Sequence, residues 1–552
     1  MFFVNENFPN KGQGGSVKHT TVVIIGGGAT GIGILRDLSM RGVKAILLEQ
    51  GGIASGASSR YHGLLHSGGR YAVKDHEAAK ECIEENMILR RIGKECVEES
   101  EGFFVLTQQD DPDFEKPWVE ACGRAGIKAE QVDVKEALRL EPALDPTIRS
   151  VYRVPDSSVD GFRLVWHNAM SARRYGGEML THHEVVAIEQ EAGRVKGVRA
   201  RNLMTGEEVR ISCDMVVNAA GSWAAKIVEL VGLEVGVQPD RGTLIAFNHR
   251  FTSRIINRLH QSSDGDIFVP HGSITILGTT SFHADRPDAH DVPTADILKL
   301  LDIGEVLIPN LRSYRILRAF AGTRPLYVPK GAAAGRGASR GFHVSDHAEE
   351  GLEGMVSIFG GKFTTYRLMA EKLCDLVCQK LGVHAECRTA IEPIIESASP
   401  EMLEKAAKYF PVHGVPLAAN RLGEAFPIVV EKAAAMKSNP LLCECEMVSR
   451  AEIEYVAADP ASQNLTDVRL RTRLGMGTCQ GTYCSLRTIG ALTECKTPFA
   501  MSPADNLRDF LQERWKGLRP ALWGLQAREM DLGRAVYAAT LNIDGAKNEQ
   551  KN

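Results

Sequence analysis

The sequence predicts an α/β fold, because strand-like runs at three places in the chain lead directly into glycines. The first run, residues 21–25, is β-branched and continuously apolar, as a parallel strand buried on both faces would be. A segment with helical periodicity and a second short strand, residues 45–48, follow it. Two later junctions, Val217–Gly221 and Phe359–Gly361, repeat the pattern. Together they indicate one parallel sheet whose carboxyl ends gather around one long ligand.

The first junction has the composition of a dinucleotide-binding turn. Its glycines are spaced G-x-G-x-x-G: Gly26 permits a tight turn, Gly28 lets a pyrophosphate approach the backbone, and Gly31 lets helix and strand pack closely. The next strand ends in Glu49, whose carboxylate would accept hydrogen bonds from a ribose. Glu49 disfavours NADP and leaves FAD and NAD, and the repeated junctions favour the longer FAD. An ordinary α/β unit with a glycine-rich turn is the structural alternative.

Composition excludes several classes of protein. The chain has 552 residues, which indicates two to four domains, and its net charge of −4 argues against broad nucleic-acid binding. It has neither an apolar leader near its start nor an apolar run of about 18 residues, so we expect a cytoplasmic protein with at most peripheral membrane contact. Twelve cysteines in so long a chain indicate metal or redox chemistry rather than a disulfide framework.

Strand and helix signals alternate between the three junctions. Residues 51–69 contain six glycines with serine and histidine among them, which indicates backbone wrapped closely around a ligand. Periodicity predicts helices at 76–100, 294–309 and 364–381, a charged helical excursion at 110–150, and strands at 103–107, 185–188, 195–200, 208–212 and across 236–283. A change in composition places a domain boundary near residue 390.

Cations stand beside three of the predicted glycine-rich segments. Arg70, followed by Tyr71, comes directly after the glycine-rich wrap, Arg324 precedes Pro325, and Lys362 follows two glycines. Convergent cations would hold a phosphorylated or carboxylated substrate through directional hydrogen bonds. Each of them taken singly could equally be a solvated surface cation.

A histidine could accept a hydroxyl proton during hydride transfer. The sequence does not choose among the candidates, and a structural role is the alternative for each. They are His62, His66, His249, His260 and His271.

Four cysteines form two close pairs, Cys443-x-Cys445 and Cys479-x₄-Cys484. Two pairs of thiolates suit a [2Fe–2S] cluster or a Cys₄ zinc site, and a metal-free structural remnant is the third alternative. The C-x-C spacing is tighter than zinc ribbons prefer, so we favour iron–sulfur.

The segment 510–524 mixes Trp515 and Trp523 with leucines and basic residues. Such an amphipathic stretch could dock on a partner or a membrane surface. We favour the alternative, a helix that caps its own domain.

Six segments of the chain resemble the FAD-dependent glycerol-3-phosphate dehydrogenases: GGGATGIG (26–33), HGLLHSGGRYAV (62–73), VVNAAGSWA (216–224), LGTTS (277–281), GTRPL (322–326) and GGKFTTYRLMAE (360–371). The C-terminal CECE (443–446) and RTRLGMGTCQGTYC (471–484) are similar to the branch that comprises the A subunits of the bacterial anaerobic enzymes. This C-terminal part resembles bacterioferritin-associated ferredoxin. Such ferredoxin-like domains usually end in C-x₂-C, whereas this chain has C-x₄-C.

The resemblance implies a fold similar to that of D-amino-acid oxidase, in which an FAD-binding Rossmann-like domain carries an interleaved β-rich substrate domain. A small helical ferredoxin-like domain would follow. The expected domains are 18–390 for FAD and substrate, with the substrate part roughly 101–160 and 236–320, a linker or helical segment at 391–439, the [2Fe–2S] domain at 440–525, and a tail at 526–552.

The resemblance also implies roles for individual residues. Arg70, Tyr71, Arg324 and Lys362 match positions that hold the substrate and its phosphate, and His249 matches a substrate-site histidine only loosely. The expected cofactor contacts are Gly26, Gly28, Gly31, Glu49, Ser58, Ser59, His66, Gly221, Gly360 and Gly361. The expected metal ligands are Cys443, Cys445, Cys479 and Cys484.

The implied activity is oxidation of sn-glycerol 3-phosphate to dihydroxyacetone phosphate. Electrons would pass through partner subunits of a membrane-associated complex to a quinone, and the chain would lie on the inner face of the cytoplasmic membrane. Two alternatives remain at this point: a flavin oxidase or dehydrogenase of amino or 2-hydroxy acids, and a non-catalytic electron-transfer subunit that has kept FAD.

Overall fold

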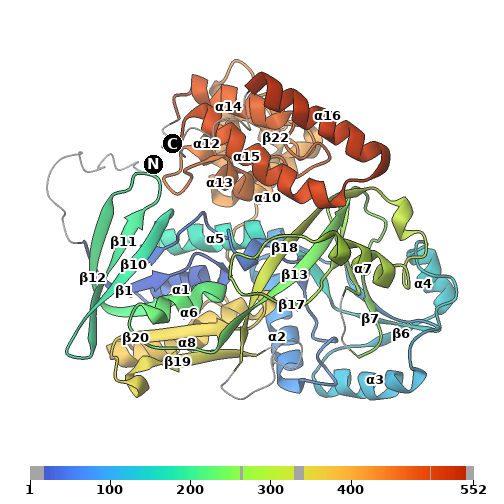
Figure 1. The fold of residues 1–552 in the computed structure, drawn as a ribbon, viewed down its shortest axis with the longest axis horizontal. Helices are drawn as coiled ribbons and strands as arrows, with labels where there is room; N and C mark the ends of the chain where they lie inside the picture. Colours follow the sequence, from blue (N-terminus) through green and yellow to red (C-terminus); the bar gives the residue numbers. More distant parts are fainter. Residues whose placement is uncertain (1–17, 262–264, 329–340, 498, 542–552) are drawn as a thin grey trace.

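A computed structural model describes residues 18–261, 265–328, 341–497 and 499–541. Figure 1 shows a parallel sheet with its helices, an antiparallel sheet beside it, and a layer of C-terminal helices, orange to red, against both. The arrangement is the mixed α/β fold that the sequence predicted.

The parallel sheet is centred on the strand that enters the first glycine turn. Its five parallel strands are, in order, β20 (Met355–Gly360), β12 (Glu208–Asn218), β1 (Lys18–Ile25), β2 (Ala45–Leu48) and β9 (Glu178–Leu180), and the antiparallel strand β19 (Phe342–Asp346) pairs with β20. Ile25 pairs with Leu48 on one side and with Asn218 on the other. This register brings the carboxyl ends of three strands level, so the glycine turns meet at one edge of the sheet.

The strand β12 is longer than predicted. The sequence shows two patterns in it, alternation at 208–212 and a continuous apolar run at 215–217, and these were expected to be separate strands. The first half pairs with the antiparallel strand β11 (Arg194–Asn202), which pairs in turn with β10 (His183–Glu191), and the second half pairs with β1. Only the second half is buried on both faces, which explains the change of pattern within one strand.

Helices cover the parallel sheet. The first of them, α1 (Ala29–Met40), packs between α5 (Gly161–Arg174) and α8 (Tyr366–Leu381). Its apolar side chains, among them Ile32, Leu35 and Leu38, are fully buried in the main core. The remaining helices of this part are α6 (Ala224–Glu229) and α2 (His76–Ile92). Gly93 follows α2, which therefore ends earlier than the residue 100 expected from charge periodicity.

The antiparallel sheet combines two distant stretches of the chain. In order, it contains β17 (Phe282–His283), β13 (Val237–Phe247), β16 (Ile274–Gly278), β15 (Ile267–His271), β14 (Ile255–Arg258), β5 (Gly102–Leu106), β7 (Ser150–Val154) and β6 (Glu130–Val132), and β18 (Ile316–Tyr327) also pairs with β13. The helices α3 (Glu115–Arg124), α4 (Val134–Leu140) and α7 (Thr294–Gly304) flank it. Its strands come from the two segments expected for the substrate part, and β18 extends that part to Tyr327.

The C-terminal helices share one core. They are α9 (Pro400–Ala406), α10 (Val415–Leu422), α11 (Phe426–Ala435), α12 (Arg450–Ala457), α13 (Leu465–Thr472), α14 (Cys484–Glu494), α15 (Pro503–Leu518) and α16 (Gly524–Leu541). Phe426, Val468, Phe510 and Trp515 belong to the same buried cluster. The segment 391–439 therefore packs with 440–525 rather than linking two bodies. In the expected tail, residues 526–541 continue α16, and 542–552 lie outside the described residues.

Trp515 is buried in this core, whereas Trp523 is exposed. The amphipathic segment 510–524 thus contributes mainly to its own domain, with α15 as the capping helix. Among the helices that the structure describes, none combines the length and the apolar character that a membrane span requires.

Ion pairs attach the C-terminal helices to the parallel-sheet domain. Arg173 contacts Asp459 at 2.6 Å, and His182 contacts Asp467 at 2.8 Å. Asp160, which also caps α5 by accepting from the Arg163 N–H, contacts Arg473 at 3.3 Å. Burial would raise the pKa of Asp160, but the charges of Arg163 and Arg473 outweigh it and hold the pKa at about 2. This carboxylate is therefore charged wherever the protein is folded near neutral pH.

Gly31→Ala tests the close packing of α1 on the first turn. A Cβ at Gly31 would overlap the Gly26 carbonyl oxygen, so we expect the substitution to destabilise the protein by about 2 kcal/mol or more. Gly123→Ala is the matched control, because Gly123 also lies in a helix but faces open space, and alanine there should stabilise by up to about 1 kcal/mol. Thermal unfolding followed by circular dichroism measures both, and equal midpoints for the two variants would contradict the packing argument.

Candidate functional site

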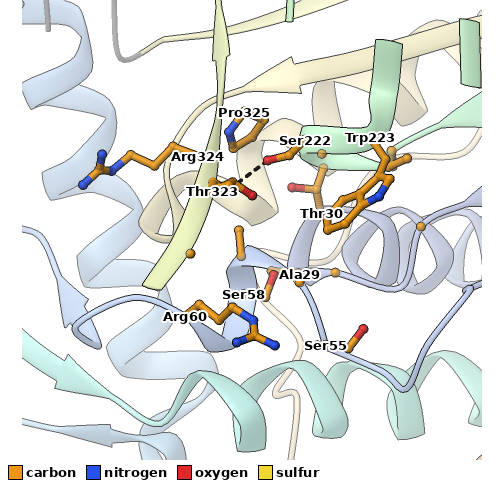
Figure 2. Close-up of a pocket in the computed structure, with 18 of the residues that line it drawn as sticks. Ala29, Thr30, Ser55, Ser58, Arg60, Ser222, Trp223, Thr323, Arg324 and Pro325 are labelled. Atoms are coloured by element: carbon orange, nitrogen blue, oxygen red, sulfur yellow. Dashed lines mark hydrogen bonds between the residues drawn. The ribbon is translucent and has the colours of Figure 1, made fainter. Parts of the chain in front are cut away.

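A cavity of about 700 Å³ opens where the parallel strands end against the antiparallel sheet. Its wall contains the three glycine junctions, part of the loop that follows Glu49, and the end of β18. Figure 2 shows Thr30 and Trp223 at one side of this space and Arg324 on the opposite side, where it projects from β18. One part of the wall is rich in glycine, and Arg324 lies across the cavity from it.

The glycine-lined end is shaped by backbone contacts. Gly26 has a φ of +114°, and a Cβ there would come within 2.5 Å of the Ala219 carbonyl oxygen. The Ala29 N–H at the start of α1 donates to the Ser58 hydroxyl at 2.9 Å. Gly31 does not line the cavity and instead packs α1 onto the turn. A close, side-chain-free approach to the helix N-terminus is the geometry that a pyrophosphate requires.

Glu49 is fixed at the same end by two backbone N–H groups. One carboxylate oxygen accepts from Gly27 at 2.6 Å, and the other accepts from Gly51 at 2.7 Å. Burial raises the pKa of Glu49, and the two N–H donors act against that rise. Oε1 also accepts from the Ser55 hydroxyl at 3.4 Å, whereas Oε2 keeps a second lone pair that can accept from a ribose hydroxyl.

Most of the other expected cofactor contacts also line the cavity. They are Ser58, His66, Gly221, Gly360 and Gly361. Ser59 does not line it: its hydroxyl donates to the Gly56 carbonyl at 3.2 Å, and the residue faces a second cavity instead. The volume of about 700 Å³, the free backbone at the glycine turns and the carboxylate of Glu49 fit a dinucleotide such as FAD.

The cationic end brings together three of the four residues expected to hold the substrate. Tyr71, Arg324 and Lys362 line the cavity, and the Lys362 ammonium lies 5.2 Å from the centre of the Tyr71 ring. Arg324 donates to Asp240, to the Thr279 hydroxyl and, at 2.8 Å, to the Thr280 carbonyl. These three contacts fix the orientation of the Arg324 guanidinium.

Arg70 lies behind the cavity wall rather than in it. It donates to Asp266 at 2.8 Å, and His260 contacts the other oxygen of the same carboxylate at 2.6 Å. The expectation that Arg70 touches the substrate therefore has no direct support in this arrangement. Its charge still acts on the cavity, because it helps to lower the pKa of His62, which lines the wall.

The structure separates the candidate histidines. His62 and His66 line the cavity. Burial, followed by the charges of Arg70 and Arg324, lowers the pKa of His62 to about 3, so this imidazole is neutral at physiological pH. Its Nδ1 accepts from the Leu64 N–H at 3.1 Å. His271 contacts the His62 carbonyl and lines the second cavity instead.

His249 is placed away from the substrate end of the cavity. Its ring stacks on Tyr314 with centroids 5.6 Å apart. Leu244, on the same strand, does line the cavity, but a strand advances by about 3.3 Å per residue, and His249 follows five residues later beyond the strand end. The loose match of His249 to a substrate-site histidine is therefore not supported.

Arg60 is a cavity residue that the sequence analysis missed. It is the only cation inside the glycine-rich wrap at 51–69, and this position was the available signal. Figure 2 shows that its side chain points in a different direction from that of Arg324. Arg60 also lines the second cavity.

The four cysteines of the two close pairs gather in the C-terminal domain. The Cys484 thiol contacts those of Cys443 and Cys479, and Cys479 also contacts Cys445. Hydrogen bonding from Cys484 lowers the pKa of Cys479 to about 5 and that of Cys443 to about 7, with help from backbone N–H groups. A Cβ at Gly477 would overlap the Cys445 side chain, so the glycine makes room for it.

This cysteine cluster is not a preformed metal cage. In the described part of the chain, no three His, Cys, Asp or Glu side chains are arranged so that they could hold a metal ion. The thiols instead hydrogen bond to one another, and none of them is in a disulfide. Four thiols in mutual contact, two of them with lowered pKa, are nevertheless a donor set that fits an iron–sulfur cluster or zinc.

The chain is similar to known flavoenzymes. The FAD dependent oxidoreductase family, DAO, matches residues 21–367. The A subunit of the anaerobic glycerol-3-phosphate dehydrogenase of Escherichia coli K12 is 42% identical over 535 residues, which cover 96% of this chain and 98% of that protein. The A1 subunit of the corresponding enzyme of Haloferax volcanii is 42% identical over 545 residues, covering 96% and 91%.

Solved structures show the same fold. The glycerol-3-phosphate dehydrogenase of Bacillus halodurans, complexed with FAD, superposes with a TM-score of 0.69 at 21% identity and covers 92% of this chain and 97% of its own. Glycine oxidase from Geobacillus kaustophilus superposes with a TM-score of 0.55 at 19% identity, covering 69% and 100%.

Glu49→Gln tests the glycine-lined end. The amide would place an N–H₂ group against one of the two backbone N–H donors, so we expect FAD affinity to fall by about 10-fold or more. FAD content after purification and flavin titration of the apoprotein measure this. Glu184→Gln is the matched control, because Glu184 lines the same cavity without accepting a hydrogen bond from a described residue. Equal losses in both variants would argue against a specific role for Glu49.

Proposed function

Because the chain belongs to the FAD-dependent glycerol-3-phosphate dehydrogenases, and among them to the family formed by the A subunits of the anaerobic enzymes, we propose that it oxidises sn-glycerol 3-phosphate to dihydroxyacetone phosphate. We propose further that the electrons leave through partner subunits to a membrane quinone, and that the chain works at the inner face of the cytoplasmic membrane.

One observation supports the proposed substrate above the others: Arg324 and Lys362 line the same cavity, and a chain of neighbouring rings links them. The charge of Arg324 acts on His62, the rings of His62, His66 and Tyr71 neighbour one another, and Lys362 lies over Tyr71. A guanidinium and an ammonium can bind the phosphate of a small polyol through charged hydrogen bonds. The two cations come from different strand ends, so the phosphate would be held from two directions. The carbon chain of the substrate would then lie between the phosphate and the dinucleotide part of the cavity.

The substrate-binding side chains are held in place before substrate arrives. Asp240 and the Thr280 carbonyl orient Arg324, and the ring of Tyr71 supports Lys362 through a cation–π contact. Bound FAD supplies the hydride acceptor. The cations would hold the substrate beside it, and such positioning can contribute several kcal/mol to the reduction of the barrier.

The proton of the C2 hydroxyl needs an acceptor at this end of the cavity. Of the candidate histidines, only His62 and His66 line it. His62 is the weaker acceptor, because its pKa is about 3 and its Nδ1 already accepts from Leu64. We therefore assign proton acceptance to His66, whose ring lies 5.4 Å from that of Tyr71, measured between centroids.

The cysteine cluster would serve as the electron exit. Cys443, Cys445, Cys479 and Cys484 would hold a [2Fe–2S] cluster, which supplies one-electron transfer between a flavin and further redox groups. The contact of all four thiols supports this assignment. Exposed apolar side chains on α16, Leu525, Leu532 and Val536, are available nearby for a partner protein.

Removing either substrate-binding cation should damage turnover of glycerol 3-phosphate. We expect Lys362→Ala and Arg324→Ala each to lower kcat/KM by about 10²-fold, because each removes a charged hydrogen bond to the phosphate. The control is Lys226→Ala, since Lys226 lines the opposite, glycine-rich end of the cavity with Trp223. Steady-state reduction of a dye acceptor at saturating FAD is the measurement. Unchanged kinetics in both cation variants would refute the proposed substrate site.

Metal analysis tests the electron exit. Anaerobically purified protein should contain about two iron and two sulfide ions per chain, and Cys479→Ser should remove them while FAD and dye reduction remain. Cys495→Ser is the control, because Cys495 lies in the same domain, hydrogen bonded to Glu454 and outside the cluster. Zinc in place of iron, or no metal in the anaerobic wild type, would overturn the iron–sulfur assignment without affecting the dehydrogenase assignment.

A further inference from the structure

A second cavity, of about 470 Å³, lies between the C-terminal helices and the rest of the protein. Its wall combines the loop around residues 51–63, the strand β18, and the helices α13 and α15. Five residues line both cavities: Gly51, Ser55, Ser58, Arg60 and Tyr61. The C-terminal residues of the wall line only the second cavity, and Tyr71, Arg324 and Lys362 line only the first, so the second space lies at the domain interface, apart from the proposed substrate end.

Five arginines line this cavity. Arg473 is paired with Asp160 and Glu446, and the other four come from four different elements. Arg60 follows the glycine-rich wrap, Arg318 lies on β18, Arg469 on α13 and Arg514 on α15. Arg318 and Arg514 both donate to the side-chain oxygen of Gln480, which fixes their planes. We call these four arginines the arginine cluster.

The arginine cluster contains more positive charges than there are carboxylates to neutralise them. Glu513 is the acidic side chain that faces it, 3.9 Å from Arg60. No carboxylate of the described chain lies within ion-pair distance of Arg318, Arg469 or Arg514. The other acidic side chains of the wall have partners of their own: Asp160 with Arg473, Asp467 with His182, and Asp509 with Arg508.

The arginine cluster also has unused hydrogen-bond donors. The Nε atoms of Arg60, Arg318 and Arg514 are buried and make no hydrogen bond with the described residues. Arg514 is 4% exposed as a whole residue. The Arg469 guanidinium makes neither a hydrogen bond nor an ion pair within the described ranges. Buried donors without acceptors are destabilising, so their retention indicates an absent acceptor.

Charge repulsion adds to this imbalance. Burial lowers the pKa of Arg318 to about 10 and that of Arg469 to about 9, and repulsion from neighbouring arginines contributes to both shifts. Each group remains mostly charged at neutral pH. The wall therefore presents several positive charges to this space, with Glu513 as the acidic side chain that faces them.

We propose that this second cavity binds a phosphate-bearing small molecule between the C-terminal helices and the flavin-binding domain. Guanidinium groups match phosphate oxygens with paired N–H donors, and a dianion would neutralise the excess charge. The space is large enough for a phosphate ester or a nucleotide and is lined by backbone and side chains of both domains. The ligand would join the two domains, since Arg60 and Arg318 lie on one side and Arg469 and Arg514 on the other.

Phosphate binding to the full-length, FAD-loaded protein tests this proposal. Isothermal titration with inorganic phosphate is carried out in the Lys362→Ala background, at constant ionic strength, so that the substrate site contributes little. We expect one saturable site, and a rise in the unfolding temperature as it fills. Adding Arg469→Gln or Arg514→Gln should weaken that binding by about 10-fold or more, because each removes charged donors.

Arg201→Gln is the matched control, since Arg201 lies on the exposed face of β11 beside Glu208 at 3.7 Å. It should leave phosphate affinity unchanged. Parallel titrations with glycerol 3-phosphate and with ATP then identify the source of the phosphate, and the tighter ligand is the physiological class. FAD content reports independently that each variant is folded.

The proposal is overturned if no phosphate compound binds saturably to the Lys362→Ala protein. It is also overturned if the affinity is the same with and without Arg469 and Arg514. Neither outcome bears on glycerol 3-phosphate oxidation, which is measured separately through Lys362 and Arg324.

Discussion

The contact between the first glycine turn and the end of β12 is the constraint on which the rest of the site depends. Gly26 passes so close to Ala219 that no side chain fits, and Gly31 lets α1 start directly against the same turn. Because β1, β2 and β12 are in register, this contact also sets the positions of Glu49 and Gly221. A shift of one residue in any of these strands would move a glycine away from the cavity and place a Cβ in it.

A second layer of buried carboxylates orients the cations around the substrate end. Asp240 holds Arg324, and Asp266 holds Arg70 while also contacting His260. Each pair is costly to bury but has hydrogen bonds that satisfy it, so the guanidinium planes cannot rotate freely. Arg70 thereby acts on the cavity through its charge rather than through contact, since it and Arg324 add to the effect of burial, which lowers the pKa of the nearby His62.

Two kinds of charge arrangement occur at the domain interface: cations paired with carboxylates, and a group of cations largely without them. Arg173, His182 and Arg473 are each matched by a carboxylate across the interface. The arginine cluster a short way along the same interface has one glutamate for four guanidinium groups. The matched pairs explain how the C-terminal helices stay attached, and the unmatched cluster indicates where a ligand would contribute to that attachment.

The sequence by itself determined the strand-to-glycine junctions, the acidic residue at the end of the second strand, and the two closely spaced pairs of cysteines. These are local patterns: glycine spacing, apolar runs and short intervals between thiols reflect geometry within a few residues. It could not determine that 208–218 is a single strand, that the segment 391–439 shares a core with the cysteine domain, or that His249 lies away from the cavity while Arg60 lines it. Those facts depend on contacts between residues far apart in the chain. Tertiary structure alone decided which cations converge, because the direction of a side chain follows from the packing of its whole strand and not from its neighbours in sequence.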